Sequence, residues 1–178
     1  MRPPPPRRRI GFVGALAEWV DAEAVATAAR ARPALAFTLA GRVEDPAFSA
    51  LGHLPNVRLL GEIPHAAVPS FLAGLDTALV PFRDTPLTRA VDPVKLYEAL
   101  AAGLPVVARR LPETARWADR IALYDDPGEL PALLDGELTN DTALRRGARR
   151  MSIESETWVA RAAALERLVT GLVGSETA

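Results

Sequence analysis

Short apolar segments alternate with stretches of helical spacing along most of this chain. Each apolar segment is four or five residues long, as buried strands are, and they span 10–14, 36–40, 57–60, 77–81, 104–108 and 121–124. Alternation of this kind predicts parallel strands joined by right-handed helical crossovers. We therefore expect an α/β fold with a Rossmann-like, doubly wound parallel sheet of about six strands in three α/β/α layers.

The stretches between and after these segments carry apolar residues at helical spacing. Helices are expected at 21–31, 66–74, 93–102, 113–118, 127–134, 141–151 and 155–172. In the last of them, Trp158, Leu165 and Leu168 form an apolar stripe, which predicts packing against the core. Doubly wound sheets bind ligands beyond the carboxyl ends of their strands. The loops of interest are therefore those that follow Gly14, Ala40, Pro81 and Ala108.

Residues 92–107 form the most informative segment. Pro93 stands where a helix begins, Gly103 stands just past its end, and an apolar strand follows at once. Lys95 and Glu98 lie three residues apart and therefore share one face of this helix. The free amides and positive dipole end of a helix N-terminus favour phosphate. A carboxylate slightly further along the helix suits ribose hydroxyls, so the segment predicts binding of a nucleoside diphosphate.

Composition narrows the range of functions. The 178 residues suffice for one domain with its own core, and a net charge of −1 gives no general attraction for nucleic acid. The chain has no cysteine, and its two histidines, His53 and His65, fall in expected loops or at a helix start, so we expect no metal site. No apolar run reaches the length of a membrane span of about 18 residues. We expect a cytoplasmic protein without a transmembrane segment.

The N-terminal region allows two interpretations. Residues 1–9 are basic and rich in proline, and the apolar run 10–17 that follows imitates a secretory signal with its cleavage site. The run is short, contains two glycines and continues directly into an amphipathic pattern. We therefore favour a first strand at 10–14. Residues 1–9 are then expected to form a linker or a disordered arm, and 10–178 one domain with a C-terminal helix at 155–172.

The segment from Asp92 to Val107 resembles the signature of the group 1 glycosyltransferases, a family with the GT-B fold. Their second Rossmann-like domain commonly carries a Ser-Pro-x-Lys-x-x-Glu pattern followed by Gly-x-Pro-Val-Val, and here Asp92 replaces the serine. Segments 54–61 and 68–82 before this signature, and the helix around Trp158 after it, occur in the same order as in the family. The resemblance implies the C-terminal half of a GT-B fold. This half binds a nucleoside diphosphate sugar, whose sugar the enzyme transfers to an acceptor hydroxyl by retaining, metal-independent chemistry without a cofactor.

The resemblance leaves the catalytic residue unassigned. Together with the helix and strand geometry, it predicts a donor site formed by Gly14, Arg89, Asp92, Pro93, Val94, Lys95 and Glu98. The chain departs from the family at two further points. Ala90 stands where many members have a glutamate that places the sugar, and no basic residue follows Gly14 in the first loop. We therefore expect Arg89 and Lys95 to neutralise the diphosphate, with Arg42 as a third candidate.

The resemblance also implies a partner. A GT-B enzyme binds its acceptor mainly in an N-terminal domain, to which a Trp-bearing last helix often crosses back. We expect that domain in a longer protein or in a partner protein, and an exposed apolar patch where it docks. Homodimerisation through that face stays open. The alternative function is a non-catalytic module that binds a nucleotide or a protein through the same fold. Under it, Lys95 and Glu98 are a surface ion pair worth about 0.2–0.5 kcal/mol, and Arg89 is an ordinary solvated arginine.

Overall fold

One parallel sheet forms the centre of the molecule, in a computed structural model that describes residues 7–174. The strand order is β3-β2-β1-β4-β5-β6, so the direction of winding reverses between β1 and β4. Every expected strand is present within two residues of its expected bounds, which confirms the predicted doubly wound sheet. The strands are β1 (Arg9–Val13), β2 (Ala36–Ala40), β3 (Val57–Gly61), β4 (Thr77–Val80), β5 (Val106–Arg109) and β6 (Ala122–Tyr124).

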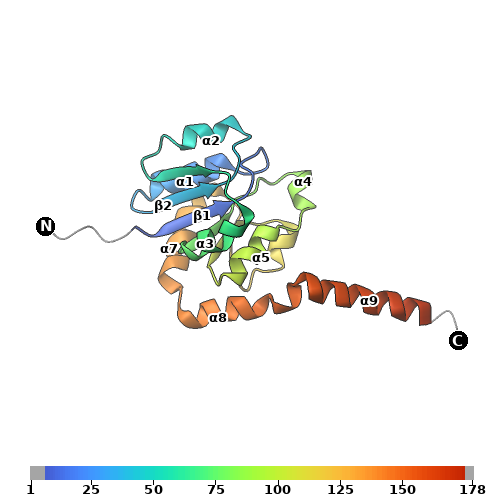
Figure 1. Ribbon diagram of the computed structural model, residues 1–178. Coiled ribbons are helices and arrows are strands. Elements are labelled where there is room, and N and C mark those ends of the chain that lie inside the picture. The colour runs from blue at the N-terminus through green and yellow to red at the C-terminus, as the bar shows by residue number, and fades with distance from the viewer. Residues whose placement is uncertain (1–6, 175–178) are drawn as a thin grey trace.

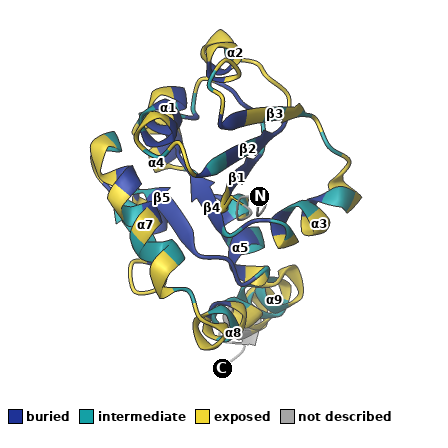
Figure 2. Ribbon diagram, turned by 90° about the vertical axis from the view of Figure 1, so that its left-hand side faces the viewer, coloured by how far each residue is buried: buried dark blue, intermediate teal, exposed yellow. Residues whose placement is uncertain are grey.

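Helices cover both faces of the sheet (Figures 1 and 2). On one face lie α1 (Ala22–Ala31) and α7 (Leu130–Asn140), and on the other lie α3 (Val68–Ala73) and α5 (Val94–Ala101), with α8 (Ala143–Ser152) beside α5. The remaining α-helices and the 3-10 turns are α2 (Pro46–Leu51), α4 (Pro86–Arg89), α6 (Pro112–Ala115), α9 (Trp158–Gly174), His65–Ala67, Pro127–Glu129 and Glu154–Glu156. None of the helices in the described part of the chain combines the length and hydropathy of a membrane span. The cytoplasmic location stays a prediction.

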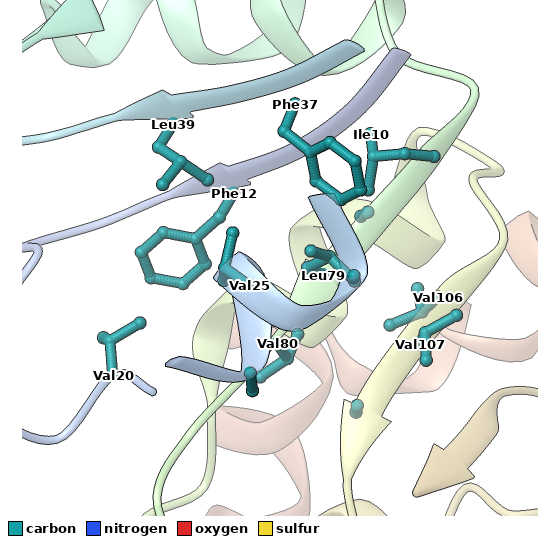
Figure 3. Close-up of a cluster of buried hydrophobic side chains, with 14 of the residues drawn as sticks. Ile10, Phe12, Val20, Val25, Phe37, Leu39, Leu79, Val80, Val106 and Val107 are labelled. Atoms are coloured by element: carbon teal, nitrogen blue, oxygen red, sulfur yellow. The ribbon is translucent and has the colours of Figure 1, made fainter. Parts of the chain in front are cut away.

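The core lies between the sheet and its helices. Strands covered on both faces bury every side chain, as all four residues of β4 show. Val25 of α1, Phe12 of β1 and Leu79 and Val80 of β4 belong to one buried cluster (Figure 3), and all four side chains are at most 4% exposed. Burying one such side chain contributes about 1.5–3 kcal/mol. Asp21 caps α1 by accepting a hydrogen bond from the Ala24 amide at 3.0 Å.

The N-terminal residues enter the sheet directly. β1 starts at Arg9, one residue earlier than expected, and is a central strand, which confirms the strand interpretation of residues 10–14. Asp76 accepts hydrogen bonds from the Arg9 amide at 2.8 Å and from the Arg8 guanidinium at 2.7 Å. Residues 1–6 of the expected linker lie outside the described residues.

The C-terminal helix does not pack as expected. The apolar stripe of α9 was predicted to join the core, but Trp158, Leu165 and Leu168 are 79%, 63% and 67% exposed, so this prediction is wrong. The reason is that the other helices already cover both faces of the sheet. After Thr157 the chain leaves the α/β body, and α9 extends away from it (Figure 1). The exposed stripe agrees with the expectation of an apolar patch.

Candidate functional site

A pocket of about 360 Å³ opens at the carboxyl ends of β1, β2 and β3, and we call it the carboxyl-edge pocket. This is the edge at which doubly wound sheets bind ligands. Gly14 and Arg42 contribute from the loops after β1 and β2, and Lys95 reaches the pocket from α5 on the other side of the switch point. The further lining residues are Val13, Ala15, Ala40, Gly41, Glu44, Glu62, Ile63, His65 and Val68.

Two glycines form the floor of this pocket. Gly14 and Gly41 have φ angles of 154° and 149°, in a region that side chains disfavour. A Cβ atom on Gly41 would lie 1.8 Å from the Gly14 carbonyl oxygen, so the two backbones touch. The Gly14 amide donates to the Ala40 carbonyl at 2.9 Å, which fixes the ends of β1 and β2 to each other. Backbone rather than side chains therefore faces the space above.

The N-terminus of α5 adjoins the pocket through Lys95. Pro93 is the N-cap residue, so the helix begins one residue later than expected, and no described side chain caps it. The first amides of a helix have no partner within the helix. Val94 is 52% exposed. The first turn of α5 therefore offers backbone donors and the positive end of the helix dipole beside a lysine.

Glu98 faces a second hollow that adjoins the first. Glu98 is one of the residues that line an apolar groove of about 470 Å³ between α3 and α5, and His65 and Val68 line both hollows. Lys95 Nζ lies 3.2 Å from Glu98 Oε2. That oxygen is buried and accepts no hydrogen bond from the described residues. The two residues that the sequence placed on one face thus line neighbouring spaces.

The charges of the carboxyl-edge pocket are balanced. Arg42 donates two hydrogen bonds to Glu44, at 2.9 and 2.5 Å, and this carboxylate raises the pKa of Arg42. Glu62 adds a second carboxylate beside Arg42 and Lys95. Both cations therefore have a carboxylate partner, and an anionic ligand has to displace it. No three His, Asp or Glu side chains within residues 7–174 are grouped as metal ligands would be, and the expected absence of a metal stays a prediction.

Two predicted donor residues have other partners. Arg89 donates to Asp84 at 2.5 and 2.9 Å, which raises the pKa of Arg89 and lowers that of Asp84. Arg89 is not among the residues that line either hollow. Asp92 accepts hydrogen bonds from the Tyr97 hydroxyl at 3.1 Å and from Arg161 of α9 at 3.3 Å. Donor binding by Arg89 and Asp92 therefore stays a prediction, as it does for Gly14 and Lys95, which line the carboxyl-edge pocket.

The loop after β3 contributes to the pocket, which the sequence did not predict. Glu62 and Ile63 follow this strand directly, His65 begins the next 3-10 turn, and all three line the pocket. The loop after β3 was not among those expected at the site, although the strand itself was predicted correctly. The position of this loop at a carboxyl end was the signal that could have identified it.

Comparison with known proteins decides the family. The chain matches the model of the family described as "Glycosyl transferases group 1" over residues 7–133. It belongs to this family. A putative teichuronic acid biosynthesis glycosyltransferase, TuaH, from Bacillus subtilis (strain 168) is 34% identical over 110 residues. The match covers 60% of this chain and only 28% of that protein, so this group 1 chain spans a minor part of its curated relative.

Solved structures show the same fold. Anabaena Alr3699/HepE in complex with UDP and glucose matches with a TM-score of 0.70 at 19% identity, over 92% of this chain and 48% of that one. AviGT4, a glycosyltransferase of avilamycin A biosynthesis, matches with a TM-score of 0.72 at 17% identity, over 93% and 52% of the two chains. The catalytic domain of cholesterol-α-glucosyltransferase from Helicobacter pylori matches with a TM-score of 0.71 at 17% identity, over 85% and 100%.

Proposed function

We propose that this domain binds a nucleoside diphosphate sugar and is the donor half of a glycosyltransferase. The observation that carries the proposal is the pair of joined hollows, with Lys95 in one and Glu98 in the other on successive turns of α5. Membership of the group 1 family and the complex of Alr3699/HepE with UDP and glucose support it. A nucleotide is elongated, anionic at one end and rich in hydroxyls near its middle, which matches this order of groups.

In the proposed complex the diphosphate lies above Gly14, at the free amides of α5. Lys95 turns from Glu98 to the phosphates, and Glu98 then accepts hydrogen bonds from the ribose hydroxyls. Arg42 adds a second positive charge when it exchanges Glu44 for phosphate. When the bond to the sugar breaks, negative charge develops on the departing diphosphate. In the complex these donors are by then directed at the diphosphate and stabilise that charge. The resemblance implies retaining chemistry without a metal, and amides and cations are the groups that such chemistry requires.

Transfer also requires an acceptor in near-attack geometry. The chain spans 48% and 52% of the two matched enzymes with longer chains, which leaves room for a second domain. We propose that an N-terminal acceptor domain, in a longer protein or in a partner, completes the enzyme. The 178-residue chain is then expected to bind the donor and to transfer sugar slowly or not at all. Efficient transfer by this chain alone would contradict the proposed division of labour.

A thermal-shift screen tests the proposal. Uridine, guanosine and adenosine diphosphates and their sugars are added to the chain, and at 100 times the dissociation constant a true ligand stabilises it by about 2.7 kcal/mol. We expect Lys95→Ala to lose most of this shift. Arg30→Ala, at the far end of α1, is the control and is expected to retain it. If no nucleotide stabilises the wild-type chain, the alternative of a protein-binding module becomes the better one.

A further inference from the structure

A third hollow lies at the switch point itself. Its volume is about 480 Å³, and we call it the Trp19 hollow, after the tryptophan in the loop that follows β1. Glu18 joins Trp19 from that loop, Asp45 comes from the loop after β2, and Arg83 and Thr85 come from the loop after β4. β1 and β4 are the two strands between which the winding reverses, where open α/β sheets bind ligands. The proposed nucleotide site does not include this hollow.

The Trp19 hollow adjoins the carboxyl-edge pocket across one backbone bridge. The Leu16 amide donates to the Arg42 carbonyl at 2.8 Å, and the amides of Glu44 and Asp45 donate to the Leu16 carbonyl at 2.9 and 3.0 Å. Gly14, before this bridge, lines the carboxyl-edge pocket, and Glu18, after it, lines the Trp19 hollow. Leu16 is fully buried. The two spaces are thus neighbours with a rigid wall between them.

The walls of the hollow are fixed before any ligand arrives. The Arg83 amide donates to the Trp19 carbonyl at 2.9 Å, and Val20 and Phe82 form an antiparallel bridge directly beside them. Asp45 accepts a hydrogen bond from the Ala47 amide at 2.9 Å, which orients its carboxylate. Preorganised groups lose little freedom on binding. This arrangement therefore suits a ligand that is recognised by the placement of its polar groups.

The side chains favour a saccharide. Trp19 is half-buried against the core and contributes an aromatic surface, while Glu18 and Arg83 are exposed. A sugar ring has an apolar face of C–H groups, which packs on an aromatic ring, and a rim of hydroxyls, which donate to carboxylates and accept from a guanidinium. Two carboxylates and one guanidinium give the hollow a net negative charge, which disfavours the binding of a phosphate group. A mixed pocket with few polar groups is typical of small-molecule sites.

We propose that the Trp19 hollow binds the acceptor saccharide, so that this domain holds part of both substrates. The inference rests on the proposed function, because an acceptor is required only if the neighbouring pocket holds a sugar donor. Trp19 packs on the ring of the acceptor, and Glu18 and Asp45 accept hydrogen bonds from its hydroxyls. The bridge at Leu16 then separates the acceptor from the donor diphosphate while both face the same edge of the sheet.

Saturation-transfer NMR tests this with maltose, cellobiose and a glucuronic-acid disaccharide as probes on the 178-residue chain. We expect at least one probe to bind, and Trp19→Ala to weaken that binding tenfold or more, whereas Trp19→Phe keeps most of it. Glu18→Gln, a substitution at an exposed position, is expected to weaken it severalfold without affecting folding. Nucleoside diphosphate affinity, measured by calorimetry, should change less than twofold in all three variants. Lys95→Ala should show the reverse pattern.

The two proposals fail in different ways. Nucleotide binding without binding of any probe would overturn the saccharide site and leave the donor site standing. Equal probe binding by wild type, Trp19→Ala and Glu18→Gln would overturn it as well, because the sugar would then lie elsewhere. If Trp19→Ala is unfolded by circular dichroism, Glu18→Gln and Trp19→Phe decide. Probe binding in the hollow by a chain that binds no nucleotide would overturn the acceptor role.

Discussion

The two ends of α5 differ in whether side chains of the protein bind their backbone groups. At the C-terminal end, Arg149 and Arg150 of α8 donate to the carbonyls of Gly103 and Ala102 at 3.2 and 3.1 Å. At the N-terminal end, Pro93 makes no side-chain cap. The protein thus satisfies the carbonyls itself and leaves the amides beside the pocket for another partner. A helix held firmly at one end can present the other end in a fixed position. Residues at the C-terminal end of α5 therefore support the site, and residues at its N-terminal end are free to bind a ligand.

The supporting end depends most on Arg149, for which we expect the largest loss of stability. Its guanidinium is buried and lies 2.7 Å from Asp141 and 3.4 Å from Glu137, and burial raises the pKa of Glu137. Arg149→Ala leaves these carboxylates without their cation and should lower the free energy of unfolding by about 3 kcal/mol. This is the lower end of the usual range, because Arg146 still pairs with Asp141 at 2.5 Å. Urea denaturation measures the difference.

Arg145→Ala is the matched control for that experiment. Arg145 is an exposed arginine on the same helix, and its guanidinium donates a hydrogen bond to the Asn140 carbonyl at 3.2 Å. Its removal should change the free energy of unfolding by less than about 0.5 kcal/mol. If both variants lose the same stability, the buried network is not what holds α8 against α5.

A smaller loss is expected at Gly103, where α5 ends. Its φ angle of 78° is in the left-handed region, and the Cβ of an alanine would lie 3.0 Å from the guanidinium of Arg150. Gly103→Ala should cost about 1–2 kcal/mol, mainly through backbone strain. Gly147→Ala is the control, because Gly147 lies within α8 with open space around it, and it should stabilise the protein by about 0.5–1 kcal/mol. If Gly103→Ala and Gly147→Ala both lose stability, helix-end strain is not the cause of the loss at Gly103.

The smallest effect on stability is expected at the binding end. Lys95→Ala removes a partly exposed ion pair with Glu98, worth about 0.2–0.5 kcal/mol. The same change should remove most of the affinity for a nucleoside diphosphate. A thermal melt with and without ligand measures both quantities in one experiment. If Lys95→Ala were as destabilising as Gly103→Ala, Lys95 would belong to the supporting residues rather than to the binding residues.

The sequence predicted the sheet well because buried parallel strands are continuously apolar, as Thr77–Val80 and Val106–Arg109 are apart from their terminal residues. It did not predict α2 and α4, since helices of six and four residues are too short to show a period. Their start signals were nevertheless present, because Asp45 and Thr85 are N-caps that each precede a proline. Local capping chemistry was therefore the better guide for short helices.

The site could be predicted only in part. Gly14 and Lys95 line one pocket, because strand ends and helix starts can be located along the sequence, but their contact with a donor stays a prediction. Arg89 was assigned to the diphosphate, but its ion pair with Asp84 depends on how α4 folds, and no pattern specifies that. The packing of the α9 stripe could not be predicted for a similar reason, because helical spacing indicates an apolar face without indicating what covers it.

The central claim is that α5 binds a nucleotide with its open end and with Glu98, and calorimetric titration of Glu98→Ala tests it most directly. Wild type, Glu98→Ala and Glu113→Ala, a control at a surface ion pair on α6, are titrated with the nucleoside diphosphate that stabilises the wild-type chain most. Loss of a charge-assisted pair with the ribose should cost about 1.5–3 kcal/mol, or roughly 10- to 150-fold in affinity. We expect this loss for Glu98→Ala alone, with stability unchanged. Equal affinity in all three proteins would contradict it.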